Sequence, residues 1–245
     1  MPHQTPCAVF SAPIPIPHIT SATRTSTFNY YGPVNSSLSS EASKFLATST
    51  DVDKEDISST IATFISATQQ DCVGEADEKT ACWLTIRVTK PSTEYKVQRW
   101  HQDGRMFPYD EGRKDVVRSK YALTLLGPTT LMLQPNEDVF SKHEQGEALH
   151  YWWRGTHGAG PSEEDRDQAD VKLRHWLAEA FKDTVRIRVG HGEVVRFSWG
   201  RDDSPVHSEP DLISDRVFVT VLYGSESELR TMCDWRDVEY GKFTS

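Results

Sequence analysis

Hydrophobic residues recur at helical spacing in two segments of the chain. Between Asp51 and Gln69 they stand three or four positions apart, and acidic residues crowd the start, as suits the positive end of a helix dipole. A second amphipathic pattern runs from Ser162 to Lys182, with Ser162 placed as an N-cap and acidic residues in the first turn. We therefore predict helices over 51–69 and 162–182.

Shorter segments alternate between apolar and polar residues, or are apolar throughout, and turn residues such as Gly127-Pro128 separate them. These patterns are typical of β-strands. The strands they predict cover residues 81–88, 95–100, 121–126, 129–133, 185–189, 193–199 and 217–223. Together with the two helices they indicate a mainly β fold with flanking helices, of the α+β class, in which the strands are mostly antiparallel.

Residues 1–50 have a different composition, rich in Ser, Thr and Pro. We interpret them as an N-terminal arm, either flexible or packed irregularly on the rest of the protein. The chain of 245 residues is long enough for one domain with a full core and short for two. The prediction is therefore a single domain over 51–245.

Charge and composition exclude several classes of partner. The formal net charge of −9 disfavours nucleic acid, because phosphate binding needs a basic surface. No run of apolar residues is long enough for a membrane helix, and the N-terminus lacks the pattern of a secretory signal, so we expect a cytoplasmic protein. The four cysteines include no C-x-x-C pair, which disfavours a cysteine zinc site.

The first candidate for chemistry is the pair His101 and Asp103. Residues i and i+2 of a strand point to the same face, so an imidazole and a carboxylate would lie side by side. Two histidines and one carboxylate on one side of a metal are typical of non-haem iron(II) oxygenases. Taken alone, the H-x-D pattern also fits a surface histidine beside a surface aspartate.

A second block lies about a hundred residues later in the chain. A strand ends at Trp199, a polar turn follows, and His207 comes next. Arg216 stands nine residues further on, at the head of a β-rich segment in which Arg216 and Thr220 share one face. A buried arginine is costly unless an anion meets it, so this pair predicts a carboxylate-binding position.

The order of these residues resembles the prolyl 4-hydroxylase-type branch of the iron(II)- and 2-oxoglutarate-dependent oxygenases. That branch has a G-[DE]-x-x-x-F strand, a turn, a metal histidine, and an arginine nine residues later in an R-x-x-x-T-V-x-Y strand. The resemblance covers residues 95–224, and the residues that match are Gly192, Glu193, Phe197, His207, Arg216, Thr220, Val221 and Tyr223, with His101 and Asp103 upstream.

The resemblance implies a double-stranded β-helix, the jelly-roll fold shared with cupins. It implies Fe(II) held by His101, Asp103 and His207, with O₂ and the co-substrate 2-oxoglutarate, which Arg216 and Thr220 would hold. Tyr121 is predicted as a further co-substrate residue, with Thr124 as the alternative. These two point to opposite faces of their strand, so at most one is correct.

Other residues carry weaker predictions. Arg118, Trp153 and Arg154 are candidate substrate residues, and the aromatic segment 148–158 is either a substrate lid or a loop packed on the core. His150 and His157 are alternative metal ligands, although neither has a carboxylate at strand spacing. His175 is expected on a helix surface.

The resulting hypothesis is an oxidoreductase that couples 2-oxoglutarate decarboxylation to oxidation of a small organic substrate, by hydroxylation as the default. A peptidyl side chain stays open as the substrate. The carboxylate at Asp103 disfavours halogenation, because halogenases of the superfamily have a small residue there. Two other classes stay open: an inactive β-helix binding module, and a cupin-type metalloenzyme that does not use 2-oxoglutarate.

Overall fold

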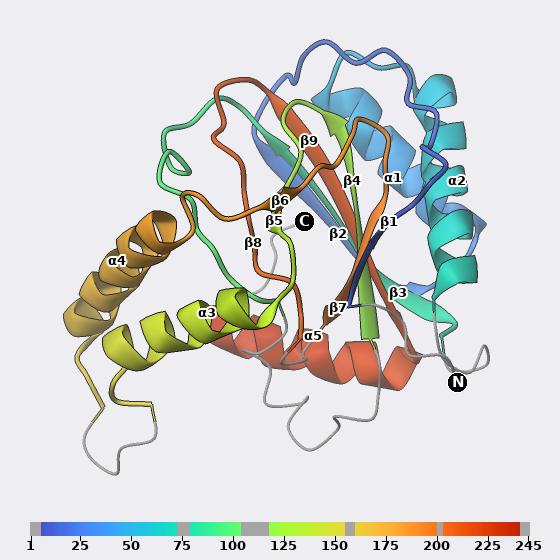
Figure 1. The fold of residues 1–245 in the computed structure, drawn as a ribbon. Coiled ribbons are helices and arrows are strands. Elements are labelled where there is room, and N and C mark those ends of the chain that lie inside the picture. Colours follow the sequence, from blue (N-terminus) through green and yellow to red (C-terminus); the bar gives the residue numbers. More distant parts are fainter. Residues whose placement is uncertain (1–5, 73–78, 104–117, 155–159, 200–202, 241–245) are drawn as a thin grey trace.

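The computed structural model describes residues 6–72, 79–103, 118–154, 160–199 and 203–240, and the structural statements below concern these residues. Within them the chain forms two antiparallel sheets with helices packed around them (Figure 1). The large sheet has the order β1-β7-β4-β9-β3-β2, and the small sheet has the order β6-β5-β8.

The strands of the large sheet are β1 (Cys7–Val9), β2 (Ser26–Pro33), β3 (Ala81–Thr89), β4 (Arg118–Leu126), β7 (Val195–Trp199) and β9 (Arg216–Gly224). Those of the small sheet are β5 (Leu131–Leu133), β6 (Arg186–Ile187) and β8 (His207–Ser208). The helices are α1 (Ser36–Ser49), α2 (Lys54–Asp71), α3 (Glu137–His150), α4 (Glu163–Ala180) and α5 (Glu226–Tyr240). None of the described helices combines the length and the apolar character needed to span a bilayer.

One face of the large sheet packs against α1 and α2 and forms the main hydrophobic core. Alternate residues of β9, such as Val219 and Val221, meet Leu46 of α1 and Phe64 of α2 there. Because strand residues alternate between faces, the intervening residues of β3, β4 and β9 point to the opposite face, which we call the inner face.

The small sheet lies over the inner face. Met132 of β5 packs against Ala122, Val195 and Phe197 of the large sheet, so the two sheets share a second core. The helices α3 and α4 cover the other side of the small sheet, where Leu177 and Phe181 meet Trp100. A third cluster, which includes Leu222 and Met232, joins α5 to one end of the inner face.

The predicted helices correspond to α2 and α4. In α4 the predicted N-cap is present: the Ser162 hydroxyl accepts a hydrogen bond from the Asp165 amide at 3.1 Å, and the Asp165 carboxylate receives one from the Ser162 amide at 3.3 Å. This capping box satisfies donors that a helix start leaves unpaired.

Residues 6–50 pack against the domain and include three regular elements, β1, β2 and α1. The strand β2 pairs with β3 along its whole length, from Ser26 opposite Val88 to Pro33 opposite Ala81. The helix α1 buries Leu38, Ala42 and Leu46 in the main core. These apolar residues form a narrow stripe on α1 and are surrounded by Ser and Thr, so the sequence pattern did not predict the helix.

The strand predicted over 95–100 is wrong. This segment makes no ladder, and the chain around it pairs only through isolated bridges between Ser92 and Leu212 and between His101 and His207. Its alternating pattern has another cause, because Trp100 fills the cluster beneath α4 while Arg99 forms an ion pair with Glu209.

The turn at Gly127 sets the position of Arg216 and gives a test of the fold. Gly127 has a φ of +80°, and a Cβ there would collide with the backbone oxygen of Asp215. We expect Gly127→Ala to lower the free energy of unfolding by at least about 1–2 kcal/mol, measured by urea denaturation. Gly160→Ala is the control, because among the described residues a Cβ at Gly160 would meet only the flexible end of Arg166, at 3.4 Å. Equal unfolding free energies for the two variants would contradict the proposed role of the turn.

Candidate metal centre

A single β-bridge joins two segments that are remote in sequence. The amide of His101 donates to the carbonyl of His207 at 2.9 Å, and the amide of His207 donates to the carbonyl of His101 at 2.9 Å. The bridge continues the small sheet, since β8 pairs with β5 on its other side. Both imidazoles then project to the same side, with ring centroids 4.4 Å apart.

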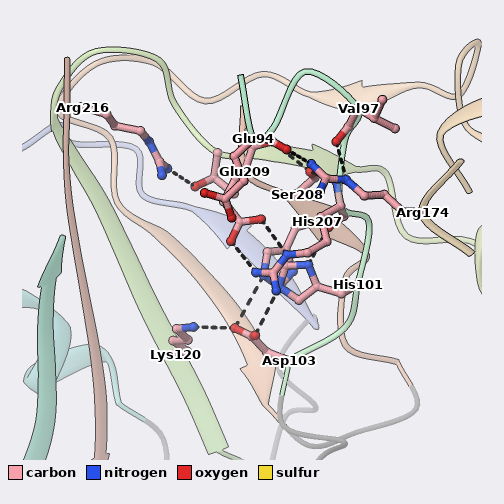
Figure 2. A network of polar contacts seen from close by, with 12 residues as sticks. Glu94, Val97, His101, Asp103, Lys120, Arg174, His207, Ser208, Glu209 and Arg216 are labelled. Carbon is pink, nitrogen blue, oxygen red and sulfur yellow. Dashed lines mark hydrogen bonds and ion pairs between the residues drawn. The ribbon is translucent and has the colours of Figure 1, made fainter. Parts of the chain in front are cut away.

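Asp103 completes a group of three possible metal ligands. Its Oδ1 lies 3.6 Å from His101 Nε2, and its Oδ2 lies 3.6 Å from His207 Nε2 (Figure 2). One donor atom from each residue fits within 4.8 Å of the others. Asp103 and His207 are buried, whereas His101 is partly exposed.

Backbone carbonyls fix the orientation of both rings. His101 Nδ1 lies 2.7 Å from the carbonyl oxygen of Arg99, and His207 Nδ1 lies 3.1 Å from that of Pro205. A carbonyl can only accept, so each Nδ1 carries the proton and each Nε2 keeps its lone pair for a metal. Partners of this kind are typical of metal-binding histidines.

The protonation states also suit a cation. Burial, followed by the neighbouring His207, lowers the pKa of His101 to about 4, so this imidazole is neutral near pH 7. Burial acts to raise the pKa of Asp103, but Lys120 and the two histidines hold it well below its usual range. Two imidazoles and one carboxylate are the donor set that a divalent iron site takes, so the residues fit the metal.

Lys120, which the sequence analysis did not select, contacts this group directly. Its Nζ lies 2.5 Å from Asp103 Oδ2 and leaves Oδ1 as the oxygen without a cation beside it. Lys120 stands on β4 two residues before Ala122, which belongs to the core between the sheets, so it shares the inner face. The alternation of strand residues between the two faces would have identified Lys120, if the sequence had shown which face is the inner one.

Side chains hold the segment around His101 to β8. Arg99 donates to both oxygens of Glu209, at 2.6 Å and 3.3 Å, and the Arg99 amide donates to the Ser208 hydroxyl at 2.8 Å. On the other side of the bridge, Gln102 donates to the carbonyl of Ser204 at 2.6 Å. We call this set of contacts the clasp. It stabilises a segment that, in the described part of the chain, has no strand neighbour beyond one bridge.

Arg216 lies on the inner face of β9 and is buried. Its Nε donates to the carbonyl of Pro128 at 3.0 Å, and one terminal nitrogen donates to the Thr130 hydroxyl at 3.0 Å. The guanidinium stands 4.1 Å from the ring centroid of Phe218. Burial lowers the pKa of Arg216 to about 10, and no carboxylate pairs with it among the described residues. The group is therefore held in place and suited to an external anion.

Glu209 connects this arginine electrostatically to the metal ligands. Burial acts to raise its pKa, yet His101 and Arg99 lower it to about 2. Glu209 also acts on the pKa values of His101 and of Arg216, so it lies within electrostatic reach of both. Arg216 and the three possible ligands consequently face one region beneath the small sheet.

The other residues predicted to hold the co-substrate lie on different faces of the large sheet. Thr220 and Thr124 point to the inner face, since Thr220 is paired with Ala122 and Thr124 with Phe218. Tyr121 lies on the opposite face, in the core with α2, and its hydroxyl donates to Asp71 at 3.1 Å. Tyr121 therefore does not lie with Arg216, because strand residues alternate between faces and its neighbour Ala122 is the one on the inner face. The hydroxyl that contacts Arg216 is that of Thr130.

Two of the candidate substrate residues come from the segment just after α3. Arg154 follows α3, pairs with Glu147 at 3.3 Å and covers the Tyr151 ring, and Trp153 packs on the same ring. Arg154 lines a cleft of about 740 Å³ on the helix side of residues 99–102, whereas His101 Nε2 is turned to Asp103 and His207. The side chain of Arg118 and all of His157 lie outside the described residues. His150 belongs to no group of three possible ligands found in the described part of the chain.

Comparison with known proteins gives weak similarities. No family model matches the chain, and no curated protein is significantly similar to it in sequence. Among solved structures, it is similar to EvdO2 from Micromonospora carbonacea var. aurantiaca complexed with 2-oxoglutarate, at 18% identity and a TM-score of 0.35 over 69% of this chain and 60% of that one. It is also similar to a prolyl-4-hydroxylase from Pseudomonas putida, at 11% identity and a TM-score of 0.33 over 84% and 77% of the two chains.

A third similar structure is a prolyl hydroxylase from Trichoplax adhaerens in complex with a peptide fragment of the hypoxia inducible factor oxygen degradation domain. The identity is 11% and the TM-score 0.31, over 84% of this chain and 86% of that one. The TM-scores of these three structures lie below 0.5, so the functional proposal below rests on the residues of this chain.

The clasp makes a testable contribution to metal binding. Glu209→Ala removes the partner of Arg99 and leaves the His101 segment held by the bridge and Gln102. We expect about tenfold weaker binding of Mn(II), measured by calorimetric titration. The matched control is Glu179→Ala, which removes an exposed carboxylate paired with Lys182 on α4 and leaves metal affinity unchanged.

Arg99→Ala tests whether Glu209 acts by holding the His101 segment in place or only through its negative charge. If Glu209 acted only as a nearby negative charge, removal of Arg99 would strengthen cation binding. The clasp predicts weaker binding for both variants, so tighter Mn(II) binding by Arg99→Ala would contradict it.

Proposed function

We propose that this chain is an iron(II)- and 2-oxoglutarate-dependent oxygenase that oxidises, by hydroxylation, a small organic substrate. The observation that carries the proposal is the convergence of His101, Asp103 and His207 with their donor atoms within 4.8 Å, on the inner face that also holds Arg216. Arg216 is a buried cation without a carboxylate partner in the described residues, and 2-oxoglutarate supplies a carboxylate.

The order of the strands supports a jelly roll as the scaffold. From β3 onward the chain visits the large sheet with β3, β4, β7 and β9. Between these visits it reaches the small sheet with the segment at His101 and with β5, β6 and β8. The bridge at His101 thus takes the place of a fourth strand of the small sheet. Two facing antiparallel sheets of four strands are the jelly-roll arrangement.

Each residue has a distinct task in the proposed enzyme. His101 and His207 would bind the metal through Nε2, and Asp103 through Oδ1, while Lys120 keeps the other carboxylate oxygen occupied. Arg216 would bind the far carboxylate of 2-oxoglutarate together with the Thr130 hydroxyl, with Thr124 and Thr220 nearby on the same face. The iron and its co-substrate, when bound, supply the oxidising chemistry with O₂, and yield succinate and CO₂.

The protein would contribute orientation and exclusion of water. The Phe218 ring and the buried hydroxyl of Thr130 hold the guanidinium in one place, so the co-substrate's direction is fixed before it binds. Asp103 and His207 are buried and His101 is partly exposed, so O₂ and substrate would enter from the side of His101.

The assignment is tested by Fe(II)-dependent formation of succinate from 2-oxoglutarate. His207→Ala and Asp103→Ala should abolish it, because two remaining ligands do not retain the metal. Arg216→Met should raise the KM for 2-oxoglutarate at least about tenfold and leave Mn(II) affinity unchanged, because a charge-assisted pair is lost. His175→Ala on the surface of α4 is the control and should behave like the parent protein.

The same measurements address the alternative classes. A binding module without catalysis would form no succinate with any variant. A cupin-type enzyme that does not use 2-oxoglutarate would bind metal yet show no dependence on Arg216. Either result would overturn the proposal.

A further inference from the structure

Among the residues that the structure describes, two basic side chains near the ligand group are neutralised by carboxylates. Lys120 pairs with Asp103, and Arg99 pairs with Glu209. Arg216 and Arg87 make no ion pair with any carboxylate in the part of the chain that the structure describes. The chain has 36 acidic residues and a net charge of −9, so acids to neutralise these two are not scarce.

The register of the large sheet fixes the direction of Arg87. Arg87 of β3 stands directly opposite Phe218 of β9, and Phe218 belongs to the core between the two sheets. Its neighbours Ile86 and Val88 belong to the main core on the other face. Arg87 therefore projects to the inner face, where it is exposed to solvent.

Arg87 and Arg216 lie close enough to act on each other. Burial is the largest cause that lowers the pKa of Arg216, Glu209 acts to raise it, and Arg87 lowers it further. Two guanidinium groups on one face repel, and the repulsion is relieved when anions bind. Arg216 is buried and held by Pro128 and Thr130, whereas Arg87 is exposed, so the two would meet different anions.

Neutral polar groups stand beside Arg87 on the same face. Thr85 is two residues earlier on β3 and is buried, and its hydroxyl donates to the side-chain oxygen of Asn29 on β2 at 3.0 Å. Thr85 is also paired with Thr220 of β9. The inner face between Arg87 and the end covered by α5 is thus polar and uncharged at these positions, as suits the body of a small polar ligand.

We infer that Arg87 binds an anionic group of the oxidised substrate, and that this substrate is a small carboxylic acid. The inference rests on the proposed function, because it assigns Arg216 to 2-oxoglutarate and leaves Arg87 for the second ligand. A single guanidinium matches a carboxylate through two parallel hydrogen bonds, which fixes the orientation of the bound acid as well as its affinity. Arg87 is then a specificity-determining residue.

The test uses pairs of probes that differ only in charge. Phenylacetate is compared with phenylacetamide, and hexanoate with hexanamide, for binding to the full-length protein loaded with Mn(II) and 2-oxoglutarate. Dissociation constants are measured by ligand-observed NMR titration. We expect each acid to bind at least about tenfold more tightly than its amide, and Arg87→Met to remove that preference.

Two variants and one further ligand sharpen the result. Arg188→Met removes an exposed arginine just after β6 and should keep the preference for acids. The affinities for Mn(II) and 2-oxoglutarate are measured separately, and Arg87→Met should leave both unchanged. Phenyl phosphate is included because it offers the same ring with a different anion.

Each outcome bears on a separate statement. Equal binding of acids and amides, with Mn(II) and 2-oxoglutarate still bound, overturns the inference and leaves the proposed function in place. Weaker 2-oxoglutarate binding by Arg87→Met assigns Arg87 to the co-substrate instead. Phenyl phosphate binding more than about tenfold tighter than phenylacetate overturns the choice of a carboxylate. Failure to bind Mn(II) or 2-oxoglutarate overturns the proposed function and the inference together.

Discussion

Two hydrogen bonds between His101 and His207 are the contact on which the rest of the candidate site depends. Residues that exchange both bonds in an antiparallel pair sit about 5.5 Å apart at Cα, with their side chains on one side. That spacing brings the imidazoles together, and Asp103 follows two residues later on the same side. The clasp is required because the His101 segment has no ladder of its own to keep this register.

The alternation of strand residues divides the large sheet between two purposes. The residues of β9 that face α1 and α2 are Val217, Val219, Val221 and Tyr223, which stabilise the fold by burial. The residues between them face the small sheet and include Arg216 and Thr220. A shift of one residue in this register would exchange the two sets, so the same core that stabilises the protein also fixes the direction of Arg216.

Much of this architecture is readable from the sequence where periodicity is strong. The helices α2 and α4, the long strands β3, β4 and β9, and the three possible metal ligands all follow from spacing and residue type. The direction of a strand face does not, because it depends on what packs against it. Tyr121 was therefore placed beside the co-substrate, whereas Lys120 and Thr130 were not selected.

Weak or interrupted patterns account for the remaining differences. Ser and Thr surround the apolar stripe of α1, and α3 buries only Val139, His143 and Gly146, so neither shows a clear amphipathic period. In residues 95–100 the alternation of apolar and polar residues does not come from strand pairing. It arises because Trp100 packs beneath α4 and Arg99 forms an ion pair with Glu209. Such cases need tertiary contacts, which no local pattern contains.

The pairing of β2 with β3 has a consequence for shortened versions of this protein. Without the N-terminal fifth of the chain, β3 would become the border of the sheet, and the outward-pointing amide and carbonyl groups along Ala81–Val88, the eight residues that now pair with β2, would lose their partners. Exposed borders of that length recruit strands from other molecules. The strand β2 covers this edge of the sheet, so a version that starts at residue 51 should aggregate before its chemistry can be assayed.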